Sequence, residues 1–340
     1  MSEEKVLLGR HLFYDKRLSK DLTISCASCH IQKKAFTDGS RFSKGVDGSP
    51  GIRSAMSLTN VAYLSTLTWS NPQITSLEFQ SLIPLFGEHP IEMGMAGQEE
   101  ILFQRLKADP KYRKLFEAAY PEESQIGSSS LYSLATITKA IASFQRTLTS
   151  FNSPYDQYKY SGKENALSKS AKEGEKLFFG EKMECYHCHG GFNFTNTMRH
   201  SRLPIPETAF HNTGLYNIDG RGAYPKNNSG LIEFTGEAGD MGKFRTPTLR
   251  NIALTAPYMH DGGLKSLRDV LNKHYSKGGM ASLSQQGISP LRDELITGFH
   301  LEEQDITNII AFLKSLTDES FINNPDHADP WKKIDTPKKK

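Results

Sequence analysis

The sequence has few of the residues that mark several common classes of protein. Cysteine occurs four times and tryptophan twice in 340 residues. No run of apolar residues approaches the roughly 18 that a membrane-spanning helix needs, so we expect no membrane span. Basic and acidic residues nearly balance at a net charge of +3, and the lysines near the C-terminus fit a solvated tail. Nothing in this composition points to nucleic acid as a partner.

The few cysteines are arranged as two C-x-x-C-H units, "CASCH" at 26–30 and "CYHCH" at 185–189. A C-x-x-C pair can be a redox dithiol, half of a zinc site or an attachment point for c-type haem. A zinc site gives no reason for a histidine after each pair, and no βαβ pattern surrounds either pair, as a thioredoxin-like dithiol requires. Haem accounts for every residue, because two thiols take up the vinyl groups and the adjacent imidazole ligates the iron. We therefore predict two covalent haem c groups. The attachment residues are Cys26, Cys29, Cys185 and Cys188, and the iron ligands are His30 and His189.

This cofactor predicts a compartment. Covalent haem attachment takes place outside the bacterial cytoplasm, so we expect a periplasmic protein. The chain opens with "MSEEKVLLGRHLF", which has no basic region followed by an apolar one and no small-residue cleavage site. We interpret this start as a mature form from which an export signal has been removed.

The length suggests about two domains, and a weak internal repeat agrees with that number. "LLGRHLFYDKRL" precedes the first haem motif and "KEGEKLFFGEKM" precedes the second, each with the pattern of a short amphipathic helix. Apolar residues at steps of three and four predict further helices over 131–148, 306–316 and 112–119. We expect a mainly α fold of two cytochrome c-like helical domains, 1–160 and 161–340, joined in the polar stretch 158–172. Long ordered loops are expected elsewhere, particularly over 190–248.

These motifs resemble the bacterial dihaem cytochrome c peroxidase and MauG superfamily. The resemblance extends from "LGRHLFYDKRLS" through both haem motifs and "TPTLRNIALTAPYMHDG" at 246–262 to the last helix. Within the superfamily, "LFGEHPIEMGM", "FHNTGLYN" and "DMGKFRTPTLRN" are most similar to the MauG-like enzymes associated with methanobactin. Those enzymes are in turn similar to enzymes that modify tryptophan in a small partner protein.

The resemblance assigns peroxide binding to the first haem, which His30 ligates. Its open face is then lined by Gln80, Pro84 and Glu92. A carboxylate in this place can move a proton from one peroxide oxygen to the other, which breaking the O–O bond requires. Glu88 is an alternative to Glu92, because the stretch that carries them is about two residues longer here than in the family.

Two further sets of residues follow from the resemblance alone. It implies one calcium ion between the haems, near Asn60, Thr255 and Pro257, where carbonyl oxygens and water suit a hard cation. It also implies that Arg245 and Arg250 pair with haem propionates, because a guanidinium fork fits a carboxylate.

The second axial ligand of the other haem decides what that haem can do, because methionine raises the potential and tyrosinate stabilises oxidised iron. Counting without a gap from His260 places His274 where peroxidases have methionine. Aligning the "HYxxGG" ending places Tyr275 there, at the cost of one extra residue in the helix. Helical phase favours Tyr275, with Met241 and Met259 as fallback ligands.

Three functions are compatible with these residues. The first is a MauG-like enzyme that uses hydrogen peroxide to reach a high-valent dihaem state and oxidises a side chain of a partner protein, tryptophan by resemblance. The others are a peroxidase that takes electrons from a small cytochrome or cupredoxin, and a non-enzymatic dihaem electron carrier.

Trp69 matches the tryptophan between the two haems and would carry electrons from one to the other. The classical peroxidases of this superfamily block the resting iron with a histidine on a loop after the first haem motif, yet no histidine lies between His30 and His89. We therefore expect the peroxide-binding haem to be open in the resting state, and we favour the first function. We expect the protein to be a monomer or a weak dimer.

Overall fold

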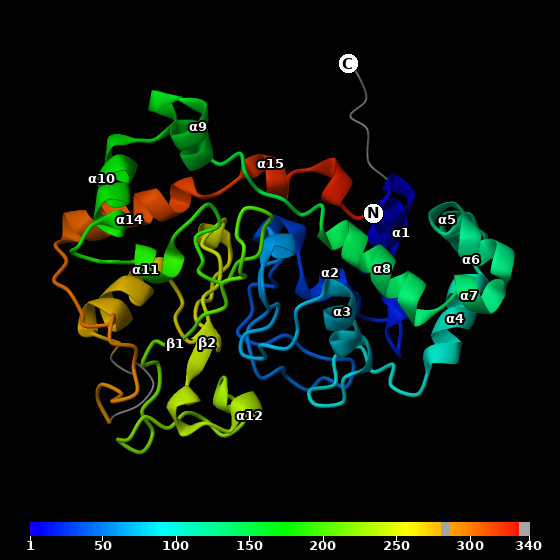
Figure 1. Ribbon diagram of the computed structural model, residues 1–340, viewed down its shortest axis with the longest axis horizontal. Helices are drawn as coiled ribbons and strands as arrows, with labels where there is room; N and C mark the ends of the chain where they lie inside the picture. The colour runs from blue at the N-terminus through cyan, green and yellow to red at the C-terminus, as the bar shows by residue number, and fades with distance from the viewer. Residues whose placement is uncertain (280–285, 333–340) are drawn as a thin grey trace.

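The structure, a computed structural model, describes residues 1–279 and 286–332. Its described part is mainly helical, as predicted, with loops between short elements (Figure 1). The helices up to residue 150 are α1 (Glu3–Phe13), α2 (Cys26–Cys29), α3 (Leu77–Phe86), α4 (Glu99–Lys107), α5 (Pro110–Ala119), α6 (Pro121–Ile126), α7 (Ser128–Leu131) and α8 (Leu134–Gln145). The later ones are α9 (Pro154–Ser161), α10 (Lys169–Phe179), α11 (Tyr186–His189), α12 (Ile232–Thr235), α13 (Leu267–Asp269), α14 (Glu303–Ser315) and α15 (Glu319–Ile322).

The described residues of the predicted loop region 190–248 contain one small sheet. Strands β1 (Phe210–Asn212) and β2 (Lys243–Arg245) pair antiparallel, with Phe210 opposite Arg245. Most of the region is loop, as expected. The sheet brings two distant parts of the chain together beside the second haem motif.

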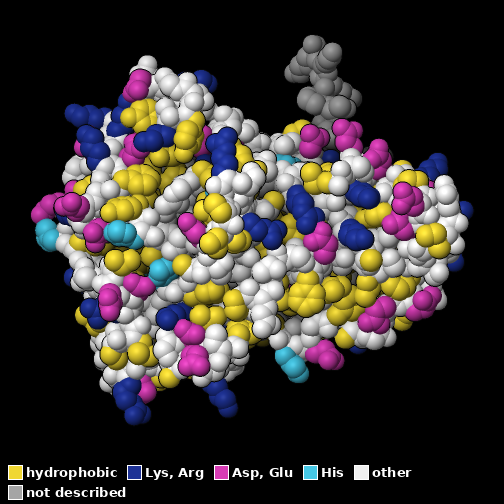
Figure 2. Space-filling view, viewed as in Figure 1, with side chains coloured by type: hydrophobic (Ala, Val, Ile, Leu, Met, Phe, Trp, Pro, Cys, Tyr) yellow, Lys and Arg dark blue, Asp and Glu magenta, His cyan; other side chains and the backbone are white. Residues whose placement is uncertain are grey.

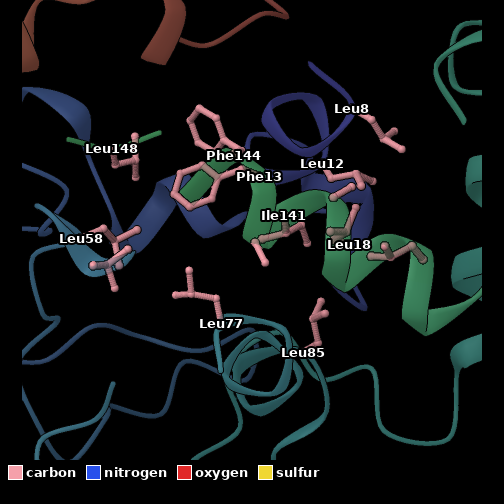
Figure 3. Packing of buried hydrophobic residues seen from close by; sticks show 14 of the residues in the cluster. Leu8, Leu12, Phe13, Leu18, Leu58, Leu77, Leu85, Ile141, Phe144 and Leu148 are labelled. Carbon is pink, nitrogen blue, oxygen red and sulfur yellow. The ribbon is translucent and has the colours of Figure 1, made fainter. Parts of the chain in front are cut away.

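The first hydrophobic core forms where α1 packs against α8. Helix α8 is capped by Ser133, whose side chain accepts a hydrogen bond from the Thr136 amide. Gly9 permits the close crossing, because a Cβ at this position would lie 1.8 Å from the carbonyl oxygen of Ala140. Figure 3 shows the apolar side chains that meet at this crossing. They include Leu8, Leu12, Phe13, Ile141 and Phe144, which are all fully buried.

The second core repeats this arrangement with α10 and α14. Gly174 faces α14 as Gly9 faces α8, and a Cβ there would lie 2.0 Å from the carbonyl oxygen of Asn308. The rings of Phe178, Phe194 and Phe312 fill this second core. The glycine in each half of the internal sequence repeat therefore has the same packing role.

The two cores exchange chain segments near the ends of the predicted domains. Tyr155 of α9 belongs to the second core, although it precedes residue 161. Phe321 and Ile322 of α15 belong to the first core, and Trp331 packs against it. Figure 1 shows α15 beyond α14, where the chain returns toward α1 and α8. The cores are thus not divided cleanly between residues 160 and 161.

The surface agrees with the composition. None of the helices in the described parts of the chain has the length and apolar character that crossing a membrane requires. On the face shown in Figure 2, lysine and arginine side chains are interspersed with acidic ones. This face therefore has no broad patch of one charge.

Candidate active site

The first of two cavities contains the first haem motif. Its lining includes Cys26, Cys29 and His30 together with Gln80, Pro84 and Glu92. The structure thus brings the three residues expected on the open face into the same cavity as the predicted iron ligand.

The second cavity contains the other haem motif. Its lining includes Cys185, Cys188 and His189, the arginine of β2, Arg245, and also Tyr275. The two cavities are similar in size, about 1540 Å³ for the first and about 1440 Å³ for the second with their open mouths included, so they can receive groups of similar size.

Both motif histidines are held in the form that binds a metal. The Nδ1 atom of His30 is 2.8 Å from the carbonyl oxygen of Phe36, and that of His189 is 3.0 Å from the carbonyl oxygen of Phe194. Each bond fixes the ring and leaves Nε2 as the nitrogen for the metal. Burial lowers the pKa of His30 and lowers the pKa of His189 to about 4, so both rings are neutral at physiological pH. This donor set fits two haem irons.

The distal side of the first cavity is built on α3. Pro84 lacks an N–H and lies within this helix, and its carbonyl oxygen accepts a hydrogen bond from the Met93 amide at 2.9 Å. This bond ties the segment that carries Glu92 back to the helix. Burial raises the pKa of the Glu92 carboxyl, which suits a group that exchanges protons. Glu88 is exposed and lies outside the lining, so the geometry favours Glu92 over its alternative.

The choice between His274 and Tyr275 depends on one wide helical turn. After α13 the chain forms a π-helix over Val270–His274, and the amide of Tyr275 donates to the carbonyl oxygen of Val270, five residues back. A π turn holds one residue more than an α turn. The structure thereby contains the extra residue that the alignment of the "HYxxGG" ending requires. Tyr275 lines the second cavity, whereas the fully buried His274 does not.

The fallback methionines differ in position. Met259 lines the second cavity, and Met241 does not. The predicted ligand Tyr275 therefore shares the cavity with one of the two fallback methionines.

Trp69 joins the two cavities. Among the described residues it alone appears in the linings of both. Its indole N–H donates to the carbonyl oxygen of Ser54 at 2.8 Å, and its own carbonyl oxygen accepts from the Arg245 amide at 2.8 Å. These two bonds hold the indole between the haem motifs, where an electron relay would have to be.

Arg245 is buried at the second cavity without a carboxylate partner among the described residues. Its guanidinium donates to the carbonyl oxygens of Thr68 and Thr246 and contacts the sulfur of Met56. Burial lowers the pKa of Arg245 to about 9. A buried cation with only neutral partners is costly, so this residue fits a propionate of a bound haem.

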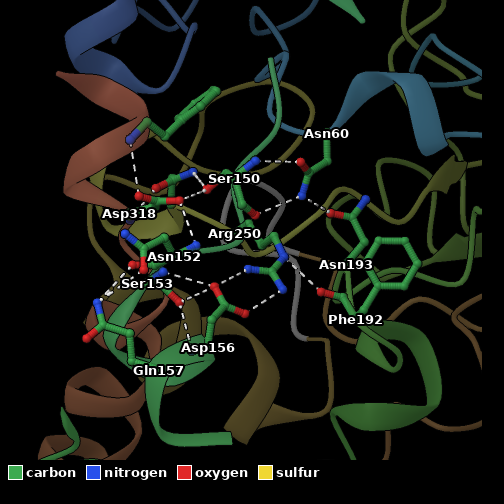
Figure 4. A network of polar contacts seen from close by, with 12 residues as sticks. Asn60, Ser150, Asn152, Ser153, Asp156, Gln157, Phe192, Asn193, Arg250 and Asp318 are labelled. Carbon is green, nitrogen blue, oxygen red and sulfur yellow. Dashed lines mark hydrogen bonds and ion pairs between the residues drawn. The ribbon is translucent and has the colours of Figure 1, made fainter. Parts of the chain in front are cut away.

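Arg250, which we expected to bind the other propionate, has different contacts. It lines neither cavity and forms a buried bidentate pair with Asp156, at 2.8 and 2.9 Å (Figure 4). Its Nε donates to the carbonyl oxygen of Phe192 at 2.8 Å. These contacts do not support a propionate role for Arg250 and indicate a structural one.

The residues expected around calcium are not joined by hydrogen bonds. The Asn60 amide oxygen accepts from the Ser150 N–H at 2.8 Å, and its nitrogen donates to Asn193 at 3.0 Å (Figure 4). Within the described residues, no hydrogen bond links Asn60 to Thr255 or Pro257, and no cluster of three His, Cys, Asp or Glu side chains could hold a metal. The calcium ion stays a prediction.

The cavities also contain polar residues that the motifs did not indicate. The Gln145 amide oxygen is buried at the first cavity and has no hydrogen-bond partner within residues 1–279 and 286–332. His211 lines the second cavity, and its Nδ1 is 2.6 Å from Asp293. Gln145 carries no sequence signal, because it ends an ordinary helix, but His211 lies in the quoted "FHNTGLYN" stretch.

Comparison with known proteins agrees with these cavities. Residues 3–165 match the model of the di-haem cytochrome c peroxidase family. The MauG methylamine utilization protein of Methylophilus methylotrophus is 32% identical over 92% of this chain and 82% of its own length. The chain belongs to the dihaem cytochrome c peroxidase and MauG family.

Two further members of this family support the assignment. Cytochrome-c peroxidase IdrP1 of a Pseudomonas species (strain SCT) is 34% identical, over 93% of this chain and 81% of its own length. A crystal structure described as a MauG-like protein associated with microbial copper homeostasis is 48% identical. It superposes with a TM-score of 0.91 over 98% of this chain and 94% of its own. The chain is therefore a haem peroxidase-type oxidoreductase, and its family implies two haem c groups.

Proposed function

We propose that the protein is a periplasmic oxidoreductase that uses hydrogen peroxide to oxidise a side chain, tryptophan by resemblance, of a partner protein by long-range electron transfer. The observation that supports this proposal most is Tyr275 in the second cavity, in the region where peroxidases supply methionine. The likeness to the MauG-like protein of copper homeostasis agrees with a methanobactin-type enzyme.

The haems supply the redox chemistry. When bound, they provide an open iron position for peroxide in the first cavity and a place to share its two oxidising equivalents in the second. The chain's own residues then act on protons and electrons. Glu92 accepts a proton from one peroxide oxygen and returns it to the other. Gln80 and Pro84 shape the space beside it.

Tyr275 would ligate the second iron as tyrosinate. Burial raises the pKa of Tyr275, so the phenol ionises only if a positive charge compensates for its burial. A ferric centre held by His189 would provide that charge. Tyrosinate favours the oxidised centre, and therefore the sharing of oxidising equivalents across both sites.

Trp69 would relay electrons between the two sites, since it borders both cavities. We also propose that Arg245 binds a propionate and that one calcium ion binds near Asn60, Thr255 and Pro257. The partner protein would remain outside the cavities. Its side chain would therefore have to give up its electrons at a distance.

A second function has support of its own, because several relatives of similar identity are cytochrome c peroxidases. Such an enzyme reduces peroxide with electrons from a small cytochrome or cupredoxin. The electron carrier is less well supported, because Glu92 gives the first cavity a carboxyl group that can exchange protons, as a catalyst requires.

Steady-state assays with reduced cytochrome c as the electron donor separate the two enzymes. The proposal predicts slow peroxide turnover by the parent holoenzyme. It also predicts that both oxidising equivalents are retained after one equivalent of peroxide is added. Electron paramagnetic resonance would show this retention as the loss of both ferric signals. Tyr275→Met should turn over faster with the same donor and lose this retention. Rapid turnover by the parent, without retention, would establish the peroxidase.

A further inference from the structure

A buried tyrosine and a buried carboxylate form a pair next to the relay tryptophan. The Tyr216 hydroxyl donates to Oδ2 of Asp261 at 2.7 Å, and these residues are 9% and 1% exposed. The same oxygen is 3.1 Å from Nη2 of Arg41, whose side chain is 51% exposed. Asp261 thus contacts both the buried phenol of Tyr216 and the exposed guanidinium of Arg41.

Tyr216 lies one ring beyond Trp69. Trp69 packs against the cluster of Leu215, Tyr216, Tyr224 and Phe244. The His260 ring is close to both, with its centroid 6.5 Å from that of Trp69 and 6.4 Å from that of Tyr216. An oxidising equivalent on Trp69 therefore has a nearby phenol, whose partner Asp261 also contacts Arg41.

A phenol gives up an electron readily only if its proton can leave at the same time. Burial and the Asp261 charge raise the pKa of Tyr216, so the phenol is neutral at rest. Asp261 can take the proton, because its Oδ2 already accepts the phenolic hydrogen bond. Its Oδ1 accepts from the Gly263 amide at 2.9 Å, which fixes the carboxylate in place.

A neighbouring tyrosine provides the matched comparison. The Tyr224 hydroxyl donates to the amide oxygen of Asn212 at 2.8 Å. Its ring is 5.3 Å from that of Tyr216. An amide oxygen accepts a hydrogen bond but is a very poor proton acceptor. Of these two tyrosines, only Tyr216 is equipped to lose an electron and a proton together.

We propose that Tyr216 is a redox relay that carries oxidising equivalents from Trp69 toward the surface at Arg41. Tyr216 gives one electron to oxidised Trp69 while its O–H proton moves to Oδ2 of Asp261, which leaves a neutral tyrosyl radical and a protonated Asp261. An electron from the partner and the return of that proton restore the pair. The relay rests on the proposed function, in which peroxide is the oxidant.

Rapid freeze-quench electron paramagnetic resonance of the holoenzyme mixed with hydrogen peroxide, without a partner, tests the relay. We expect a neutral tyrosyl signal in the parent and in Tyr224→Phe, and none in Tyr216→Phe. Asp261→Asn keeps a hydrogen-bond acceptor but removes the base, so the signal should form about 10²-fold more slowly. Ring-deuterated tyrosine should narrow the signal, which identifies it as tyrosyl.

The haem signals in the same samples distinguish the two possible failures. If peroxide changes the ferric haem signals but no radical depends on Tyr216, the relay is wrong and the proposed function stands. If peroxide leaves the haem signals unchanged, the proposed function fails and the relay fails with it. A tyrosyl signal of equal intensity in Tyr216→Phe would assign the radical to another residue.

Discussion

Tyr275 and His274 are neighbours in the chain, yet only Tyr275 lines the second cavity. Their ring centroids are 4.9 Å apart and their ring planes are 79° apart. The π-helix over Val270–His274 supplies the extra residue that carries Tyr275 to the cavity. Single π turns inside helices occur frequently at functional sites, which agrees with a ligand at this position.

Replacement of these two neighbours tests which one holds the second iron. Tyr275→Phe should abolish the low-spin state of that haem and the sharing of oxidising equivalents, because phenylalanine has no donor atom. Peroxide binding at the first haem should persist. His274→Ala should leave the spin state intact. Resonance Raman and electron paramagnetic resonance spectra of both variants provide the measurement, and the opposite pattern would assign the ligand to His274.

The resting state of the first haem offers a second test. Because no histidine lies between His30 and His89, we expect one high-spin, five-coordinate ferric haem beside one low-spin haem. Electron paramagnetic resonance of the oxidised protein should show both signals. Ser43, which lines the first cavity, lies in the loop where a blocking histidine would stand. Ser43→His should therefore convert part of the high-spin signal to low-spin. Two low-spin signals in the parent would indicate an electron carrier.

The sequence predicts what is local or chemically distinctive. Two C-x-x-C-H units indicate the haem attachment, and apolar spacing predicts α5 and α14. The helix predicted over 131–148 contains all of α8 and extends three residues beyond each of its ends. The glycine repeated before each unit, Gly9 and Gly174, lies at a close helix crossing in both halves.

Contacts between residues that are far apart in the chain could not be predicted from the sequence. Arg245 and Arg250 lie five positions apart in one motif. Arg245 has no carboxylate partner in the described part of the chain, whereas Arg250 is paired with Asp156, 94 residues away. The return of α15 to the first core depends on packing that no local pattern encodes. Likewise, helical phase favours Tyr275 over His274, but no local periodicity shows that a π turn supplies the extra residue.

The buried pair of Asp156 and Arg250 leads to a prediction for stability. Asp156→Ala leaves the Arg250 guanidinium buried without its counter-charge, which should lower the free energy of unfolding by about 3–5 kcal/mol. Glu173→Ala, which removes an exposed partner of Lys176, is the matched control and should cost at most about 0.5 kcal/mol. Thermal unfolding of the three holoproteins, followed by circular dichroism, measures the difference. Equal midpoints for both variants would contradict the structural role of Arg250.

Glu92 and Glu88 provide a matched pair for the proton transfer at the first haem. Glu92 lines the cavity, and burial raises the pKa of its carboxyl, whereas Glu88 is exposed. The carboxylate must be ionised to accept a proton from peroxide. The rate of reaction with peroxide should therefore fall as the pH drops through this raised pKa and stay constant above it. Glu92→Gln should lower the rate by about 10²–10⁴-fold and remove this pH dependence, because an amide cannot shuttle the proton.

Glu88→Gln should react at the parent's rate with the parent's pH profile, because Glu88 does not reach the cavity. Stopped-flow absorbance of the first haem, recorded over a pH series, measures all three proteins. Its amplitude also shows whether each variant still binds peroxide. If Glu88→Gln loses the pH dependence and Glu92→Gln retains it, the two glutamates exchange roles. The longer stretch between Gln80 and Glu92 would then place Glu88, four residues before Glu92, at the first haem. Such a placement requires a rearrangement of the loop that the Pro84–Met93 hydrogen bond holds in place.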